Sequence, residues 1–261
     1  MEMPRSFGWS GLCARLGPYI VSGLVLTSAA FANGTAVTKL FEEADRRIEA
    51  QEASIESLRA AVLLYEEAAR IEPTNVEVHV RLADAALSLG DAPDGDPLVW
   101  YERGLKAAER AVALDDHHAH AHFLIAAHRG HIARQRKLES PLVVRDLENR
   151  LRRVLALNPS HAPALNMTAM LLRDTPALLR PLLRGSQLDV ERYLVAAVKA
   201  NPNFSEARLN LAEHYRSIGK ITEARMEAEA IVRMTHPTQV RRWRTKDRRA
   251  AEELLRELRA K

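Results

Sequence analysis

Cysteine and glycine are both scarce in this chain. Its single cysteine is Cys13, and glycine occurs 11 times in 261 residues. One thiol cannot form a disulfide within the chain, and it excludes zinc sites and iron–sulfur clusters built from several cysteines. So few glycines argue against a glycine-rich phosphate loop and against an all-β chain with many tight turns. Aromatic residues make up only 5%, whereas the helix formers alanine, leucine, arginine and glutamate are abundant, which favours an all-α fold.

Catalytic motifs are absent as well. The sequence contains no G-x-S-x-G, no H-E-x-x-H, no P-loop and no G-x-G-x-x-G. Neighbouring acids such as Glu42 and Glu43 point in different directions on a helix, so we interpret them as a charged surface rather than a catalytic pair. The net charge of +4 is mild and does not call for nucleic acid. The sequence therefore predicts a protein that is not an enzyme and needs no cofactor.

Residues 1–32 have the layout of a secretory signal peptide. Arg5 and Arg15 precede an apolar run over 19–26, and the small-x-small stretch Ala30–Ala32 closes the segment. The apolar run is shorter than the roughly 20 residues that a membrane span needs. We therefore expect cleavage and export, most simply to a bacterial periplasm. The alternative is an uncleaved membrane anchor.

Residues 33–261 contain a repeat of 43 residues. Four stretches share one apolar pattern, and their closing alanines are Ala83, Ala126, Ala169 and Ala212. Turn-forming residues at 73, 116, 159 and 202 repeat with the same period of 43, and the last step, to 236, is 34 residues. Small residues at i, i+4 and i+7 before each turn share one helical face, and proline ends most units. The repeat predicts helical hairpins over 37–73, 74–116, 117–159, 160–202 and 203–237.

The last unit resembles the tetratricopeptide repeat (TPR). Six residues fall on that family's large, small, aromatic and turn positions, namely Leu211, Ala212, Tyr215, Gly219, Ala224 and Ala228. The resemblance implies a right-handed α-solenoid of about five hairpins, with a capping helix over 246–260. The longer units carry nine extra residues each, which we expect between their two helices as insertions around 90–97, 130–141 and 175–186.

The predicted export, the insertions and the tail Trp243–Asp247 together make the chain similar to a narrower subgroup of this family. It comprises the periplasmic T component of TRAP-type solute transporters and the related regulators of microtubule dynamics. The subgroup implies a non-enzymatic scaffold that binds a protein or peptide, here as an accessory of periplasmic solute uptake. The alternative function is a carrier of a metal or an apolar small ligand. A homo-oligomer is left open, and an exported chain is not expected to bind nucleic acid.

In such a solenoid the first helices of the hairpins line a concave groove. The repeat places at this face Val80, Asp84, Phe123, Asn166, Met170, Leu209 and Glu213. We expect the apolar residues of this set to contact a partner, and Asn166 to hydrogen-bond a bound backbone. The alternative is that the insertions fold across the face and bury these residues as core.

Two further clusters carry binding hypotheses. His118 and His122 are four residues apart, the helical spacing that places two imidazoles on one metal ion, although no third ligand is fixed by spacing. Solvated histidines at a helix start are the alternative. The basic residues Arg241, Arg242 and Arg244 surround a tryptophan and suit an anionic surface such as lipid headgroups. The alternative there is a polar connection into the capping helix.

Overall fold

The structure is a computed structural model, and it describes residues 34–48, 54–92, 96–136, 140–176, 179, 183 and 189–259. The signal peptide predicted over 1–32, with Cys13, lies outside these ranges. Helices make up most of the described chain, and no strand occurs in it. Within the same ranges, no helix is both long and apolar enough to cross a bilayer.

The helices follow one another as antiparallel hairpins. Residues 34–48 are helical and pack on α2 (Ile55–Ile71). The next pairs are α3 (Val76–Gly90) with α4 (Pro97–Leu114), α5 (Ala119–Gln135) with α6 (Pro141–Leu157), α7 (Ala162–Asp174) with α8 (Val190–Ala200), and α9 (Ser205–Ser217) with α10 (Ile221–Val232). The chain continues through α11 (Val240–Arg242) and a π-helical turn (Trp243–Asp247) into α12 (Arg248–Arg259).

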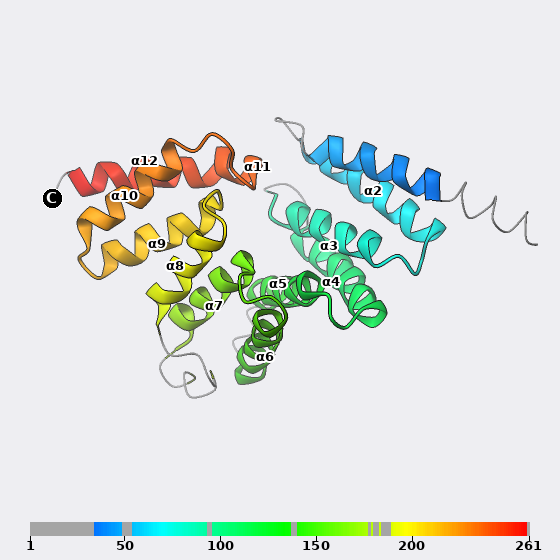
Figure 1. The fold of residues 1–261 in the computed structure, drawn as a ribbon, viewed down its shortest axis with the longest axis horizontal. Helices are drawn as coiled ribbons and strands as arrows, with labels where there is room; N and C mark the ends of the chain where they lie inside the picture. Colours follow the sequence, from blue (N-terminus) through cyan, green and yellow to red (C-terminus); the bar gives the residue numbers. More distant parts are fainter. Residues whose placement is uncertain are drawn as a thin grey trace, which may run out of the picture.

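Successive hairpins stack side by side in an arc, with α2 at one end, α6 and α7 at the middle, and α12 at the other end (Figure 1). The fold is therefore an all-α solenoid, as the repeat predicts. No hairpin can bury its apolar face alone, so each one depends on its neighbours for a core.

The repeated alanines are fully buried where helices pack together. Ala83, Ala126, Ala169 and Ala212 are all 0% exposed. The small residues of the second helices are equally buried, among them Ala61, Ala108, Ala111, Ala197, Ala224 and Ala228. Because alanine has only a methyl group, it lets a neighbouring backbone approach closely while still covering apolar surface. The period in the sequence is thus the period of helix packing.

The joints between hairpins are short turns, and in three of the four below one polar side chain closes the turn. Turns lie at 73–74, 116–117, 159–160 and 202–203. Asp115 Oδ1 accepts the backbone N–H two residues ahead at 2.9 Å, and Asn158 and Asn201 do the same at 3.1 and 3.0 Å. Such a side chain completes the turn locally, which is why Asp or Asn recurs there.

Most of the extra residues of the first two long units are helical. The first insertion, predicted around 90–97, coincides with the connection between α3 and α4, whereas the first half of the second, predicted around 130–141, belongs to α5. The helices α3 to α6 have 15, 18, 17 and 17 residues, against 13 and 12 in α9 and α10. The connections they leave are only 91–96 and 136–140. A longer helix extends the same buried stripe, so these residues add to the packing instead of forming an exposed edge. The connection over 175–189 alone is long, as expected for the third insertion.

Candidate binding surface

Histidines begin two of the first helices. His118 is the N-cap of α5 and His161 the N-cap of α7, one period apart. The Nδ1 atoms of His118 and His161 accept the backbone N–H groups of Ala121 and Ala164, each at 3.2 Å. An acceptor at this position satisfies one of the N–H groups that the first turn of a helix leaves without a partner. Both rings therefore have a structural role.

His118 and His122 do not act together as metal ligands in this arrangement. His122 donates from Nε2 to the carbonyl oxygen of Asp116 at 2.8 Å, whereas His118 is engaged in its cap. One period earlier, His79 makes the same bond to the carbonyl of Pro73 at 3.0 Å, so this position closes the joint. Across the described ranges, no three His, Cys, Asp or Glu side chains gather as a metal site. The spacing of four residues follows from capping and joint closure.

The apolar residues predicted for the groove are mostly core. Val80, Phe123 and Leu209 are buried, the first two in one cluster with α4, α5 and α6, and the last against α10 and α12. Side chains covered in this way offer little area to a partner, which agrees with the core alternative. Among the described residues, neighbouring helices cover them.

A chain of hydrogen bonds connects three successive units. His120 Nε2 lies 2.8 Å from Asp84 Oδ2, and His120 Nδ1 lies 3.0 Å from His161 Nε2. The ring of Phe123 lies 5.6 Å from that of His120 and 5.1 Å from that of His161, centroid to centroid. The side chains of His120 and Asp84 are 32% and 44% exposed, so this polar row reaches solvent. The repeat predicted Asp84 at this face, but neither histidine contact could be read from it.

The direction of each hydrogen bond in this row follows from the cap of α7. Because the N–H of Ala164 donates to His161 Nδ1, the neutral ring carries its proton on Nε2. That proton is donated to His120 Nδ1, so His120 donates from Nε2 to Asp84. A metal ion shared by the two rings would need a lone pair on His161 Nε2, which the cap does not leave.

The two histidines of the row differ in their affinity for a proton. Burial, together with the charge on the neighbouring His120, lowers the pKa of His161 to about 4. Burial also lowers the pKa of His120, but the hydrogen bond and charge of Asp84 outweigh it, and the net pKa is raised. An added proton therefore goes to His120.

Polar contacts continue between α7 and α9. Asn210 donates from Nδ2 to Asn166 Oδ1 at 2.9 Å, so the oxygen of Asn166 is already engaged within the protein. Arg173 lies 3.9 Å from Glu213, and their side chains are 39% and 43% exposed. Met170 is half-buried on the same helix as Asn166. Together with Asp84, Met170 and Glu213 keep accessible atoms, and their contact with a partner stays a prediction.

The C-terminal basic run is anchored by a buried acid. Asp247 is fully buried and accepts from the Ser205 hydroxyl at 2.7 Å. Arg242 lies 3.3 Å from Asp247 and 3.0 Å from Glu206. These contacts commit Arg242 to the packing of the cap, in agreement with the polar-connection alternative.

The tryptophan of this run is also structural. Trp243 donates from Nε1 to the carbonyl of Ile231 at 2.8 Å and packs in the core of the last hairpin. Arg241 is half-buried and Arg244 is exposed. An anionic surface would therefore meet a smaller basic set than the sequence indicates.

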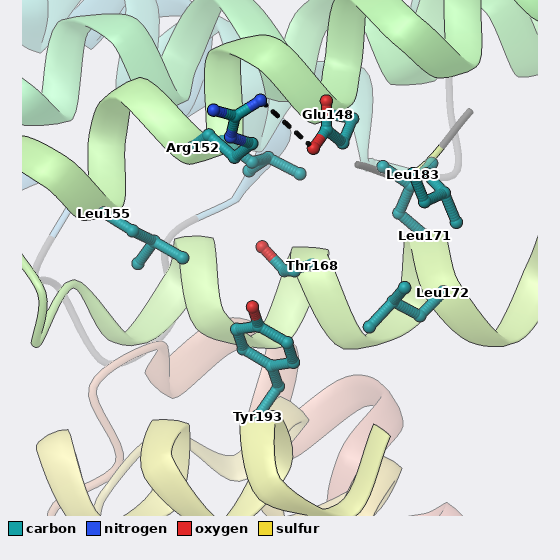
Figure 2. A pocket seen from close by; sticks show the side chains of 9 residues that line it. Glu148, Arg152, Leu155, Thr168, Leu171, Leu172, Leu183 and Tyr193 are labelled. Atoms are coloured by element: carbon teal, nitrogen blue, oxygen red, sulfur yellow. Dashed lines mark ion pairs between the residues drawn. The ribbon is translucent and has the colours of Figure 1, made fainter. Parts of the chain in front are cut away.

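A cleft opens between α6, α7 and α8, where the repeat is irregular (Figure 2). One period of 43 after the start of α6 at Pro141 would fall at residue 184, but α8 begins only at Val190. The cleft has a volume of about 330 Å³, including its open mouth, and is lined by Leu151, Leu155, Leu171, Leu172, Leu183, Thr168, Tyr193 and the pair Glu148–Arg152. The carboxylate of Glu148 is buried, 3.7 Å from Arg152. Sequence analysis did not predict this cleft.

Comparison with known proteins bears on the fold. Neither a protein-family model nor a curated protein matches the chain. Among solved structures, TTC0263, a thermophilic TPR protein of Thermus thermophilus, is similar with 22% identity and a TM-score of 0.57, over 81% of this chain and 99% of that one. PilF of Pseudomonas aeruginosa is similar with 13% identity and a TM-score of 0.51, over 89% and 93%. The chain therefore has the fold of the TPR proteins.

Proposed function

We propose that this chain is a non-enzymatic scaffold that binds a protein or peptide along its first helices, α3, α5, α7 and α9. The observation that carries the proposal is the row of polar side chains on these helices. Asp84 with His120, and Arg173 with Glu213, hold one another in place while each stays 32–44% exposed. Because these groups are already ordered, a partner gains their hydrogen bonds without the entropic cost of fixing them.

We propose further that the protein is exported and serves periplasmic solute uptake. The support is the signal-like composition of residues 1–32 and the resemblance to the transporter-associated subgroup. Sequencing the N-terminus of the protein recovered from an osmotic-shock fraction tests the export. A chain that retains residues 1–32, or stays with the cytosol, would contradict it.

A carrier of an apolar ligand is the second candidate. The leucine-lined cleft between α6, α7 and α8 favours it over a metal carrier. Extraction of the purified protein with organic solvent, followed by mass spectrometry, tests this function. Replacing Leu172 by Lys in the cleft should then abolish any co-purifying apolar compound.

Photo-crosslinking tests the scaffold proposal with a matched pair of methionines. Met170 lies on the proposed surface, and Met226 is 66% exposed on α10, a second helix. Each is replaced separately by a benzophenone amino acid, and the protein is irradiated in its own cell envelope. The proposal predicts one discrete partner captured from position 170 and not from position 226. Equal capture from both positions would place binding elsewhere.

A further inference from the structure

The hydrogen-bond row of Asp84, His120 and His161 cannot accept one more proton and keep all its bonds. The lone pair on His120 Nδ1 already receives the proton of His161 Nε2. Protonation of His120 at Nδ1 leaves two N–H donors facing each other across 3.0 Å. If His161 instead carries its proton on Nδ1, that proton opposes the N–H of Ala164, and the cap of α7 is lost.

We propose that this row is an acid-sensitive hinge, in which protonation of His120 releases the start of α7 from α5 and changes the opening of the binding surface. The inference rests on the proposed function only in naming that surface. His120 keeps its bond to Asp84, which becomes an ion pair, so α5 stays attached to α3. The contact that yields is therefore the one between α5 and α7.

The packing around this boundary permits such a movement. Beside α7 lies the cleft lined by residues of α6, α7 and α8. The second helix of this unit has 11 residues, whereas α4 and α6 have 18 and 17.

The charged groups that act on His120 come mainly from α3. They are Asp84, which is bonded to it, and Glu77 and Arg81 further away; His161 faces it from α7. On the sides of α4 and α6 the ionic groups are paired among themselves, Arg129 with Glu109 and Asp146, and Arg153 with Asp116. Asp84 stabilises the imidazolium, so the hinge is closed above neutral pH and loosens as the pH falls.

Hydrogen exchange in the first turns of α7 tests the hinge in the full chain without a partner. After correction for intrinsic exchange, protection of residues 164–169 should fall about tenfold between about pH 7.5 and 5.5, which is the effect of losing an N-cap. His161→Asn keeps a capping side chain but removes the second imidazole, so this variant should show no such change.

His118→Asn is the matched control. His118 caps α5 at the same 3.2 Å, and among the described residues no histidine contacts its other ring nitrogen. This variant should keep the response of the unchanged chain at α7. Unchanged protection of α7 in the wild type, or a full response in His161→Asn, would overturn the hinge.

Asp84→Asn provides a test that does not depend on replacing His161. It keeps an acceptor for His120 but removes the charge that favours the imidazolium, so the pH midpoint of the exchange change should move to lower pH. An unmoved midpoint would overturn the proposal. Far-UV circular dichroism at neutral pH checks that each variant is folded. Because no partner is present, a negative result here leaves the crosslinking test at Met170 unaffected.

Discussion

Acidification should destabilise the fold through His128, which is buried in a neutral state. The side chain is 0% exposed, donates from Nε2 to the carbonyl of Ala83 at 3.1 Å, and has no hydrogen-bond partner at Nδ1. The space it fills exists because residue 104 is glycine: a Cβ there would lie 2.1 Å from Cε1 of His128. Burial lowers the pKa of His128 from 6.5 to about 4.

The sign and size of this effect follow from proton linkage. The unfolded chain takes up a proton as the pH falls below about 6.5, whereas the folded chain resists it until about 4. The folding free energy is therefore maintained above about pH 6.5 and is lost progressively toward pH 4. At about pH 5 the loss from His128 alone is about 2 kcal/mol.

Urea unfolding followed by circular dichroism measures this loss. In the wild type the lowered pKa values of His131 and His161 add to this loss and the raised pKa of His120 opposes it, so the difference between the wild type and a His128 variant isolates the part due to His128. At neutral pH, His128→Leu should lower the free energy of unfolding by about 1 kcal/mol, because the hydrogen bond is lost. Between about pH 7.5 and 5, the free energy of unfolding of this variant should fall by about 2 kcal/mol less than that of the wild type. If acidification lowered the free energy of unfolding equally in the wild type and in His128→Leu, the effect could not come from His128.

Three further variants and one control test the packing. Gly219 has φ +80°, so Gly219→Ala should lower the free energy of unfolding by about 1 kcal/mol and the melting temperature by about 3 °C. An unchanged melting temperature would contradict the left-handed backbone at this turn. Gly104→Ala should cost roughly 1–3 kcal/mol in urea unfolding because its Cβ meets the imidazole of the neighbouring helix, whereas Gly34→Ala, with nothing within 4 Å, should cost none. Asp247→Ala removes the buried acceptor of Ser205 and should make the cap susceptible to limited proteolysis; full resistance would show that the cap is held by apolar packing alone.

The packing period could be predicted because small residues recur at the positions where helices pack. Alanines such as Ala83 and Ala126 recur where backbones must approach closely, and Asn158 and Asn201 recur where a turn must close. Both requirements depend on residue type at a fixed spacing, so a single sequence reveals them. The all-α solenoid followed from that pattern.

Helix lengths were harder to predict, because a glycine can either end a helix or make room for a neighbouring side chain within one. Gly130 suggested the start of an insertion, but it lies inside α5, where a Cβ would come within 3.1 Å of Met167. Its missing side chain makes room for a neighbour and does not break the helix. Pro97 and Pro141 were better markers, since each stands in the first turn of a helix.

The polar row was missed because its contacts depend on how helices are offset. His118 and His122 looked alike as ligands, although the same spacing of four also suits a cap followed by a joint donor. The bonds of His120 to Asp84 and His161 cross 36 and 41 residues, neither of which is the period of 43. Only the relative placement of three helices brings these side chains together.

Three units of the repeat meet at Asp84, His120 and His161. Long-range nitrogen–proton NMR spectra of the imidazoles test it most directly, because they report which ring nitrogen carries the proton. The structure predicts the Nε2–H form for both histidines at neutral pH, with His120 taking up a proton well before His161. An Nδ1–H form of either ring, or two independent titrations near the ordinary pKa of histidine, would contradict this arrangement.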